Sequence, residues 1–231
     1  MSEKFEAILL EHETLNKLIK EKDLNTFVKF PSIDTFSAEF IDWLSPQYYD
    51  AFVEIYTTHL GSKKESKVVK LINSTWFCNA ETTDRIVAFL SERLDTTAEL
   101  SKQLNKKITG NKNLEDILNV SGSMVNDVLN YVNKAIFEKE HPVIIEKKNE
   151  ILNNSLGVCE ALKHFKASSE IEFQMFNGIL DRLKNIKLNT EQQARYDACI
   201  SKSKSSSNKY AIVTVIIAII VIIRMIARFA N

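Results

Sequence analysis

The sequence predicts an all-α fold, a multi-helix bundle of about seven or eight helices followed by a single C-terminal transmembrane helix. Three observations predict it. Apolar residues recur every three or four positions along most of the chain, which is the period of an amphipathic helix. Only 5 glycines and 3 prolines occur in 231 residues, whereas sheets need turn residues at regular intervals. The uncharged run from Tyr210 to Ile223 is apolar around its whole circumference.

Caps, prolines and glycines mark where the helices begin and end. Ser45-Pro46 has the pattern of an N-cap followed by proline at the first helical position, and Gly61 is expected just past the end of that helix. His141-Pro142 interrupts the chain, and Ser169-Glu-Ile-Glu172 has the pattern of a capping box. The expected helices cover residues 5–19, 36–44, 46–60, 63–77, 84–108, 114–132, 143–165 and 169–186.

The chain is expected to have three parts. Residues 1–188 form a helical domain, because the apolar periodicity extends that far. Residues 189–209 are polar and contain the low-complexity stretch from Ser201 to Asn208, which predicts a flexible linker. Residues 210–230 form a membrane anchor.

The anchor prediction depends on length and on two arginines. A spanning helix needs about 20 apolar residues. The segment reaches that length if Arg224 and Arg228 extend their charged ends toward the lipid headgroups. The alternatives are a buried core helix and an interfacial helix, although the segment has no polar face. The expected anchor residues are Tyr210, Ile212, Val213, Val215, Ile216, Ile217, Ile219, Ile220, Val221, Ile222, Ile223, Arg224 and Arg228.

The flanks of the anchor predict its orientation and its membrane. The first residues are charged and no apolar signal sequence follows them, so we expect a tail-anchored, single-pass protein with its N-terminal domain in the cytosol. Lys202, Lys204 and Lys209 precede the apolar run, and two arginines follow it. A short tail with basic flanks resembles the anchors of mitochondrial outer-membrane and peroxisomal proteins. We favour the mitochondrial outer membrane, with the endoplasmic reticulum and the peroxisome as open alternatives.

Composition and motifs argue against several function classes. Thirty acidic and thirty basic residues give zero net charge, which is unlike a nucleic-acid-binding protein. Cys78, Cys159 and Cys199 form no paired motif, which suits a reducing compartment. The sequence contains no phosphate-binding loop, zinc-protease motif or hydrolase nucleophile motif. We therefore expect no enzyme activity, no cofactor, no metal and no small-molecule substrate.

Protein binding is the remaining expectation, and an aromatic cluster is its candidate site. Aromatic side chains contribute strongly to interface energetics, and grooves between amphipathic helices commonly accept a partner helix. The alternative is that these rings form the core. The cluster consists of Phe36, Phe40, Trp43, Tyr48, Tyr49 and Phe52. The leading interpretation is a tail-anchored adaptor or scaffold that contacts membrane lipid through its tail and binds an unidentified protein partner.

Two families share this layout of helical domain, linker and tail. A seven-residue apolar repeat runs from Ile151 to Ile186, and in this respect the chain resembles a SNARE membrane-fusion protein. The repeat fails at Thr190, and the layer positions near its centre, Glu172 and Phe176, are neither Gln nor Arg. In size, all-α character and tail the chain resembles the Bcl-2-like apoptosis regulators, including viral members, which implies a groove that binds helical peptides. Their Asn-Trp-Gly-Arg signature is absent, since Trp43 and Trp76 have no adjacent glycine.

Overall fold

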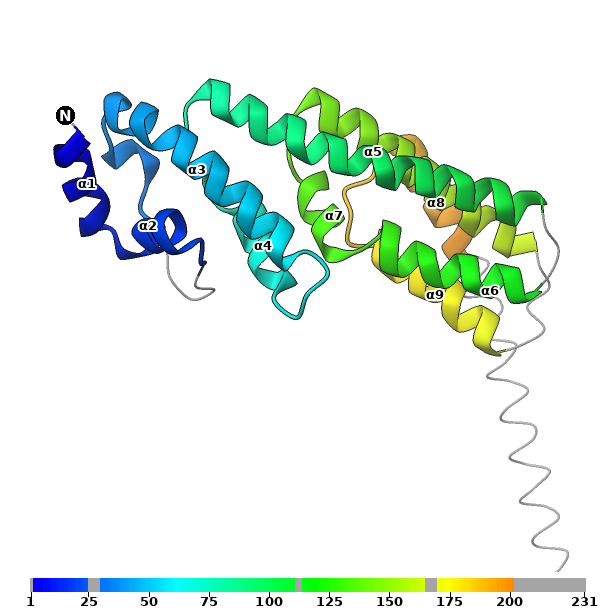
Figure 1. Ribbon diagram of the computed structural model, residues 1–231. Helices are drawn as coiled ribbons and strands as arrows, with labels where there is room; N and C mark the ends of the chain where they lie inside the picture. Colours follow the sequence, from blue (N-terminus) through cyan, green and yellow to red (C-terminus); the bar gives the residue numbers. More distant parts are fainter. Residues whose placement is uncertain (1, 25–29, 111–113, 165–169, 202–231) are drawn as a thin grey trace, which may run out of the picture. The chain divides into compact units, whose positions relative to one another are not determined.

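The computed structural model describes residues 2–24, 30–110, 114–164 and 170–201, and every regular element within these ranges is helical (Figure 1). This confirms the all-α prediction. The α-helices are α1 (Ser2–Glu11), α2 (Glu13–Asn16), α3 (Ala38–His59), α4 (Glu65–Asn73), α5 (Ala80–Gly110), α6 (Leu114–Ser123), α7 (Tyr131–Phe137), α8 (Pro142–His164) and α9 (Glu170–Leu183). Residues 190–201 are also helical. Shorter π- and 3₁₀-helical segments cover Lys17–Glu21, Ile33–Thr35 and Met124–Val128.

The chain divides into two compact units. Unit 1 contains residues 1–100 and 128–150, and unit 2 contains residues 101–127 and 151–231. Helices α5 and α8 each contribute residues to both units.

The N-terminal helix expected over residues 5–19 is divided in unit 1. Helix α1 ends at Glu11, and His12 takes a non-helical conformation with φ −113° and ψ 82°. Helix α2 then passes into the π-helical segment Lys17–Glu21, which ends at Lys22 in the left-handed conformation with φ 51°. The break changes the direction of the chain, so that Phe5 on one side of it and Leu18 on the other are both buried.

Helix α3 differs most from the sequence prediction, because Ser45-Pro46 lies inside it and does not begin a new helix. The true N-cap is Ser37, whose side chain accepts a hydrogen bond from the Phe40 N–H at 3.3 Å. The Ser45 hydroxyl donates to the Ile41 carbonyl at 2.7 Å, as a side chain within a helix does. Proline inside a helix removes one backbone hydrogen bond. We attribute its tolerance to the continuous apolar face, which buries Phe40, Leu44, Tyr48 and Phe52 on both sides of the proline.

Three other helix boundaries of unit 1 have clear capping residues. Gly61, with φ 70°, follows the end of α3 as expected. The Asn79 side chain accepts from the Thr82 N–H at 3.0 Å at the start of α5. The Asn130 side chain accepts a hydrogen bond from the Asn133 N–H at 2.8 Å and caps the start of α7. Because α7 begins at Tyr131, the single helix expected over residues 114–132 is divided. Helix α4 contacts both α3 and α7.

Unit 2 contains α6, α9, the helix over residues 190–201 and segments of α5 and α8. Helices α6 and α9 contact each other along their lengths (Figure 1). Its buried side chains include Met124, Ile151, Leu156, Ile179 and Leu183. The helix at 190–201 lies in the stretch where the sequence predicts a flexible linker. The rest of that linker, residues 202–209, lies outside the described residues.

Candidate functional site

The predicted membrane anchor, residues 210–230, lies outside the described part of the chain, so its residues are known here only as sequence. None of the described helices combines the length and the apolar composition that crossing a membrane requires.

The predicted aromatic cluster divides into buried and half-buried rings, all in unit 1. Phe40, Tyr48 and Phe52 are fully buried. Burial raises the pKa of the Tyr48 phenol, since the phenolate would lose its hydration. These three residues lie in the core, as expected if the rings of the cluster serve packing and not partner binding.

The other three members, Phe36, Trp43 and Tyr49, are half-buried. The ring of Phe36 stacks on Phe40 with centroids 5.0 Å apart, and Trp43 contacts the same Phe40 ring at 5.7 Å. Tyr49 is covered on one face by the Arg85 guanidinium, 4.1 Å from its centroid. Phe36 and Trp43 therefore pack against the buried Phe40 ring on one side and keep part of their surface exposed.

A shallow depression lies next to Phe36. It has a volume of about 290 Å³ and is lined by Glu11, His12, Glu13, Thr14, Phe30 and Pro31. The imidazole of His12 packs edge-on against Phe36 with centroids 4.8 Å apart, so the depression and the exposed edge of Phe36 are adjacent. Its lining combines carboxylates with apolar rings, which suits a mixed protein surface better than a buried small molecule.

Titratable groups elsewhere do not converge. Within the described ranges, no group of three or more His, Cys, Asp or Glu side chains is placed to hold a metal ion. All three cysteines lie in the described ranges, where they form no disulfide and are buried. Burial raises the pKa of the Cys78 thiol and, more strongly, of the Cys159 thiol, which disfavours the reactive thiolate.

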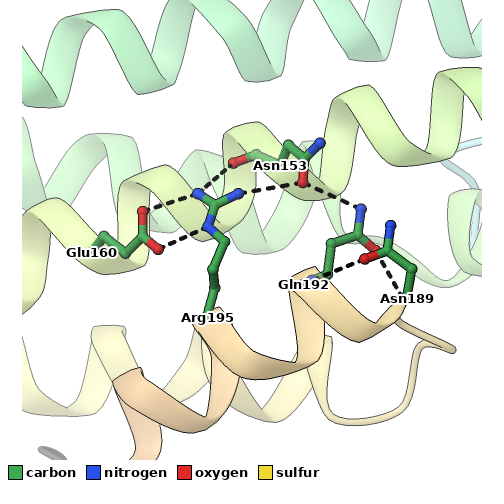
Figure 2. A network of polar contacts seen from close by, with 5 residues as sticks. All are labelled: Asn153, Glu160, Asn189, Gln192 and Arg195. Atoms are coloured by element: carbon green, nitrogen blue, oxygen red, sulfur yellow. Dashed lines mark hydrogen bonds and ion pairs between the residues drawn. The ribbon is translucent and has the colours of Figure 1, made fainter.

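A polar network in unit 2 holds the helix at residues 190–201 against α8 (Figure 2). The helix begins at a reciprocal capping pair. The Gln192 N–H donates to the Asn189 side chain at 2.9 Å, and the Asn189 N–H donates to the Gln192 side chain at 3.1 Å. The Gln192 amide also donates to the Asn153 side chain of α8 at 3.3 Å.

Arg195 is the centre of this network. Its guanidinium donates two bonds to the carboxylate of Glu160 on α8, at 2.8 Å from Nε and 2.9 Å from Nη2. The same guanidinium reaches the side-chain oxygen of Asn153 at 3.3 Å and its carbonyl at 3.4 Å, as Figure 2 shows. Two parallel bonds to one carboxylate are both stronger and more directional than a single bond.

The buried face of the same helix carries Gln192, Tyr196 and Cys199. The Tyr196 hydroxyl donates to the Leu180 carbonyl of α9 at 3.3 Å, so the helix contacts α9 as well as α8. Sequence reasoning missed this element because its surroundings are polar. Two signals were available in the sequence. Residues 192, 196 and 199 are spaced at the helical period, and the Asn-x-x-Gln pattern over residues 189–192 is typical of a helix start.

Comparisons with models of known protein families, with curated proteins and with solved structures found no match for this chain. Within the SNARE-like repeat, residues 165–169 lie outside the described residues, between α8 and α9.

Proposed function

We propose that the chain is a membrane-anchored helical adaptor or scaffold, in which residues 210–230 cross a membrane and the helical units bind a protein partner on its cytosolic face. The observation that carries this proposal is the run from Tyr210 to Ile223, which has no charged residue. Exposing apolar surface to water costs about 25 cal/mol per Å². A run of this length therefore favours a lipid environment unless a protein surface covers it.

The half-buried aromatic rim of unit 1 supports the binding part of the proposal. Phe36 and Trp43 are fixed from behind by Phe40, so a partner that covers them immobilises little additional side-chain freedom. The adjoining depression is lined by Glu13, which forms an ion pair with Lys17, and by Glu11, whose carboxylate favours a partner with a basic group beside an apolar anchor. We assign this aromatic rim, Phe36 and Trp43 with the depression beside His12, as the partner-binding surface.

Localisation of fluorescent fusions tests the membrane part. The full chain, tagged at Met1, should outline an organelle, whereas the same fusion truncated before Tyr210 should be diffuse. The outlined organelle distinguishes the mitochondrial outer membrane from the endoplasmic reticulum and the peroxisome. Diffuse fluorescence of both fusions would refute the anchor.

A matched pair of variants separates hydrophobicity from length. Ile217→Asp with Ile220→Asp places two charges in the run, each costing about 2.5–3.5 kcal/mol at the centre of a spanning helix. We expect this variant to be diffuse. The control, Ile217→Leu with Ile220→Leu, keeps the apolar character and should localise as the natural chain does. Equal localisation of both variants would mean that something other than membrane insertion retains the protein.

A further inference from the structure

We propose that the helix over residues 190–201, here called the clasp helix, sets the distance between unit 2 and the membrane. While it is docked on α8 and α9, only residues 202–209 can act as the tether, and its release would lengthen the tether to residues 189–209. The inference rests on the proposed function, because it needs the membrane anchor at residues 210–230.

The clasp helix depends on docking for its structure. It has only about three turns, and isolated helices shorter than about 12–15 residues are marginal in water. Only one face is attached, because Gln192, Tyr196 and Cys199 are buried whereas Gln193, Ala194 and Asp197 are exposed. A released clasp helix would therefore lose its helical form and behave as extended chain.

The attachment relies on a charged pair at the edge of the interface. The Arg195 side chain is 27% exposed and that of Glu160 is 38% exposed, so water can reach both ends of the pair. Behind it, two apolar side chains, Tyr196 and Cys199, are buried. The attachment therefore combines three buried side chains with a charged pair that water can reach, and segments at the edge of a core open at lower free energy than its centre.

The lengths of the two tethers differ by more than a factor of two. An extended chain spans at most about 3.4 Å per residue. Residues 202–209 therefore hold unit 2 within about 27 Å of the start of the anchor, whereas residues 189–209 would allow about 71 Å. This change exceeds the thickness of a lipid bilayer core, which is about 30 Å. It would determine which partners near the membrane unit 2 can reach.

Buried Cys199 gives a direct readout of docking. The full chain in detergent is exposed to a maleimide, and the labelling rate of each cysteine is measured by peptide mass spectrometry. We expect Arg195→Ala to accelerate labelling of Cys199 at least tenfold, because loss of the bidentate pair raises the population of the released state. Cys78 in unit 1 should react at an unchanged rate. Gln193→Ala, on the exposed face of the same helix, is the matched control and should change neither rate.

Two further variants separate release from general unfolding. Glu160→Gln keeps the shape of the pair without its charge and should accelerate labelling less than Arg195→Ala. The double exchange Glu160→Arg with Arg195→Glu should restore part of the protection. Hydrogen exchange of α6 and α9 serves as the reference for unit 2. Acceleration confined to residues 190–201 supports the clasp. Equal acceleration throughout unit 2, or none at Cys199, would overturn it.

Vesicles containing anionic lipid and an acceptor dye test the tether length. The full chain carries a donor dye on a cysteine introduced by Lys106→Cys, an exposed position of unit 2, with Cys199 replaced by alanine in both proteins so that release of the helix adds no second labelling site. We expect less energy transfer to the acceptor dye in the membrane from the Arg195→Ala protein than from the protein with the natural Arg195–Glu160 pair. If the protein floats with the vesicles but transfer is equal, the tether inference is wrong and the anchor stands. If the protein fails to float, the proposed function itself is wrong.

Discussion

Two glycines of unit 2 should respond to alanine substitution in opposite ways. Both Gly157 on α8 and Gly178 on α9 lie inside helices. A methyl group at Gly157 would lie 2.8 Å from Oδ1 and 2.9 Å from Nδ2 of Asn105 on α5. A methyl group at Gly178 would meet only Val125, at 3.9 Å, which is ordinary van der Waals contact. Gly157→Ala should therefore destabilise unit 2, and Gly178→Ala should stabilise it.

The magnitudes follow from three effects. Alanine is favoured over glycine in a helix interior by about 1 kcal/mol, which acts at both positions. At Gly157, overpacking costs about 1–3 kcal/mol. Moving the Asn105 amide also disrupts its 3.4 Å bond to Asn154, at a cost of about 0.5–1.5 kcal/mol. We expect Gly157→Ala to lower the free energy of unfolding by about 0.5–3.5 kcal/mol and Gly178→Ala to raise it by about 0.5–1 kcal/mol.

The buried cysteines allow the two units to be followed separately. Cys159 and Cys199 report on unit 2 and Cys78 on unit 1 when thiol exposure is measured against urea concentration. Tryptophan fluorescence also follows unit 1, because Trp43 and Trp76 both belong to it. The urea midpoint of unit 2 should shift in opposite directions for the two alanine variants, whereas the two unit 1 signals should stay unchanged.

A double-mutant cycle tests the proposed cause. The Asn105 Oδ1 atom is buried without a hydrogen-bond partner, so Asn105→Ala removes an unsatisfied polar atom. Asn105→Ala also removes the bond to Asn154, so this background is itself less stable by up to about 0.5–1.5 kcal/mol, and the effect of position 157 is measured relative to it. In that background alanine at position 157 has room, and the Gly157→Ala substitution should become neutral or stabilising. If its cost is the same with and without Asn105, the contact between α5 and α8 is not the reason, and the reasoning fails.

Two further predictions concern unit 1. Ser45→Ala should lower its free energy of unfolding by about 1–3 kcal/mol in a urea titration followed by fluorescence, because the Asn79 N–H, which donates to the Ser45 hydroxyl at 2.8 Å, would lose its acceptor. Burial raises the pKa of Tyr56 to about 12. The buried neutral phenol of Tyr56 should contribute fully to stability below pH 10. This contribution should decline as the pH rises toward 12, because the unfolded chain loses the phenol proton first. Absorbance at 295 nm would contradict this if all tyrosines ionised near pH 10.

Apolar periodicity was sufficient to predict helices, but local caps were not sufficient to place every boundary. Ser45-Pro46 has a valid N-terminal pattern, yet the chain remains helical through it, because Phe40 and Leu44 before the proline share one buried face with Tyr48 and Phe52 after it. Tertiary burial along a continuous face outweighs the cost of one missing hydrogen bond. Gly61 was placed correctly because a left-handed residue after a helix is a local requirement.

The aromatic cluster shows a second limit of sequence reasoning. Its members share one helical region, but a single sequence does not show which rings other elements will cover. Phe40 is buried because Phe36, four residues earlier, and Phe5, from α1, pack against it, and the contact with Phe5 depends on tertiary structure. Only after this packing does an exposed rim at Phe36 and Trp43 become distinguishable from the core.

The clasp helix shows why composition alone is a poor guide to linkers. Residues 190–201 are polar because most of their surface faces water, and the same composition would describe a disordered tether. Order comes from three buried side chains at helical spacing and from Glu160, more than thirty residues earlier in the chain. If the proposed clasp operates, the number of residues between the docked helix and residue 210 depends on a tertiary contact. A change at Glu160, far from the anchor in sequence, should alter how far unit 2 reaches from a membrane.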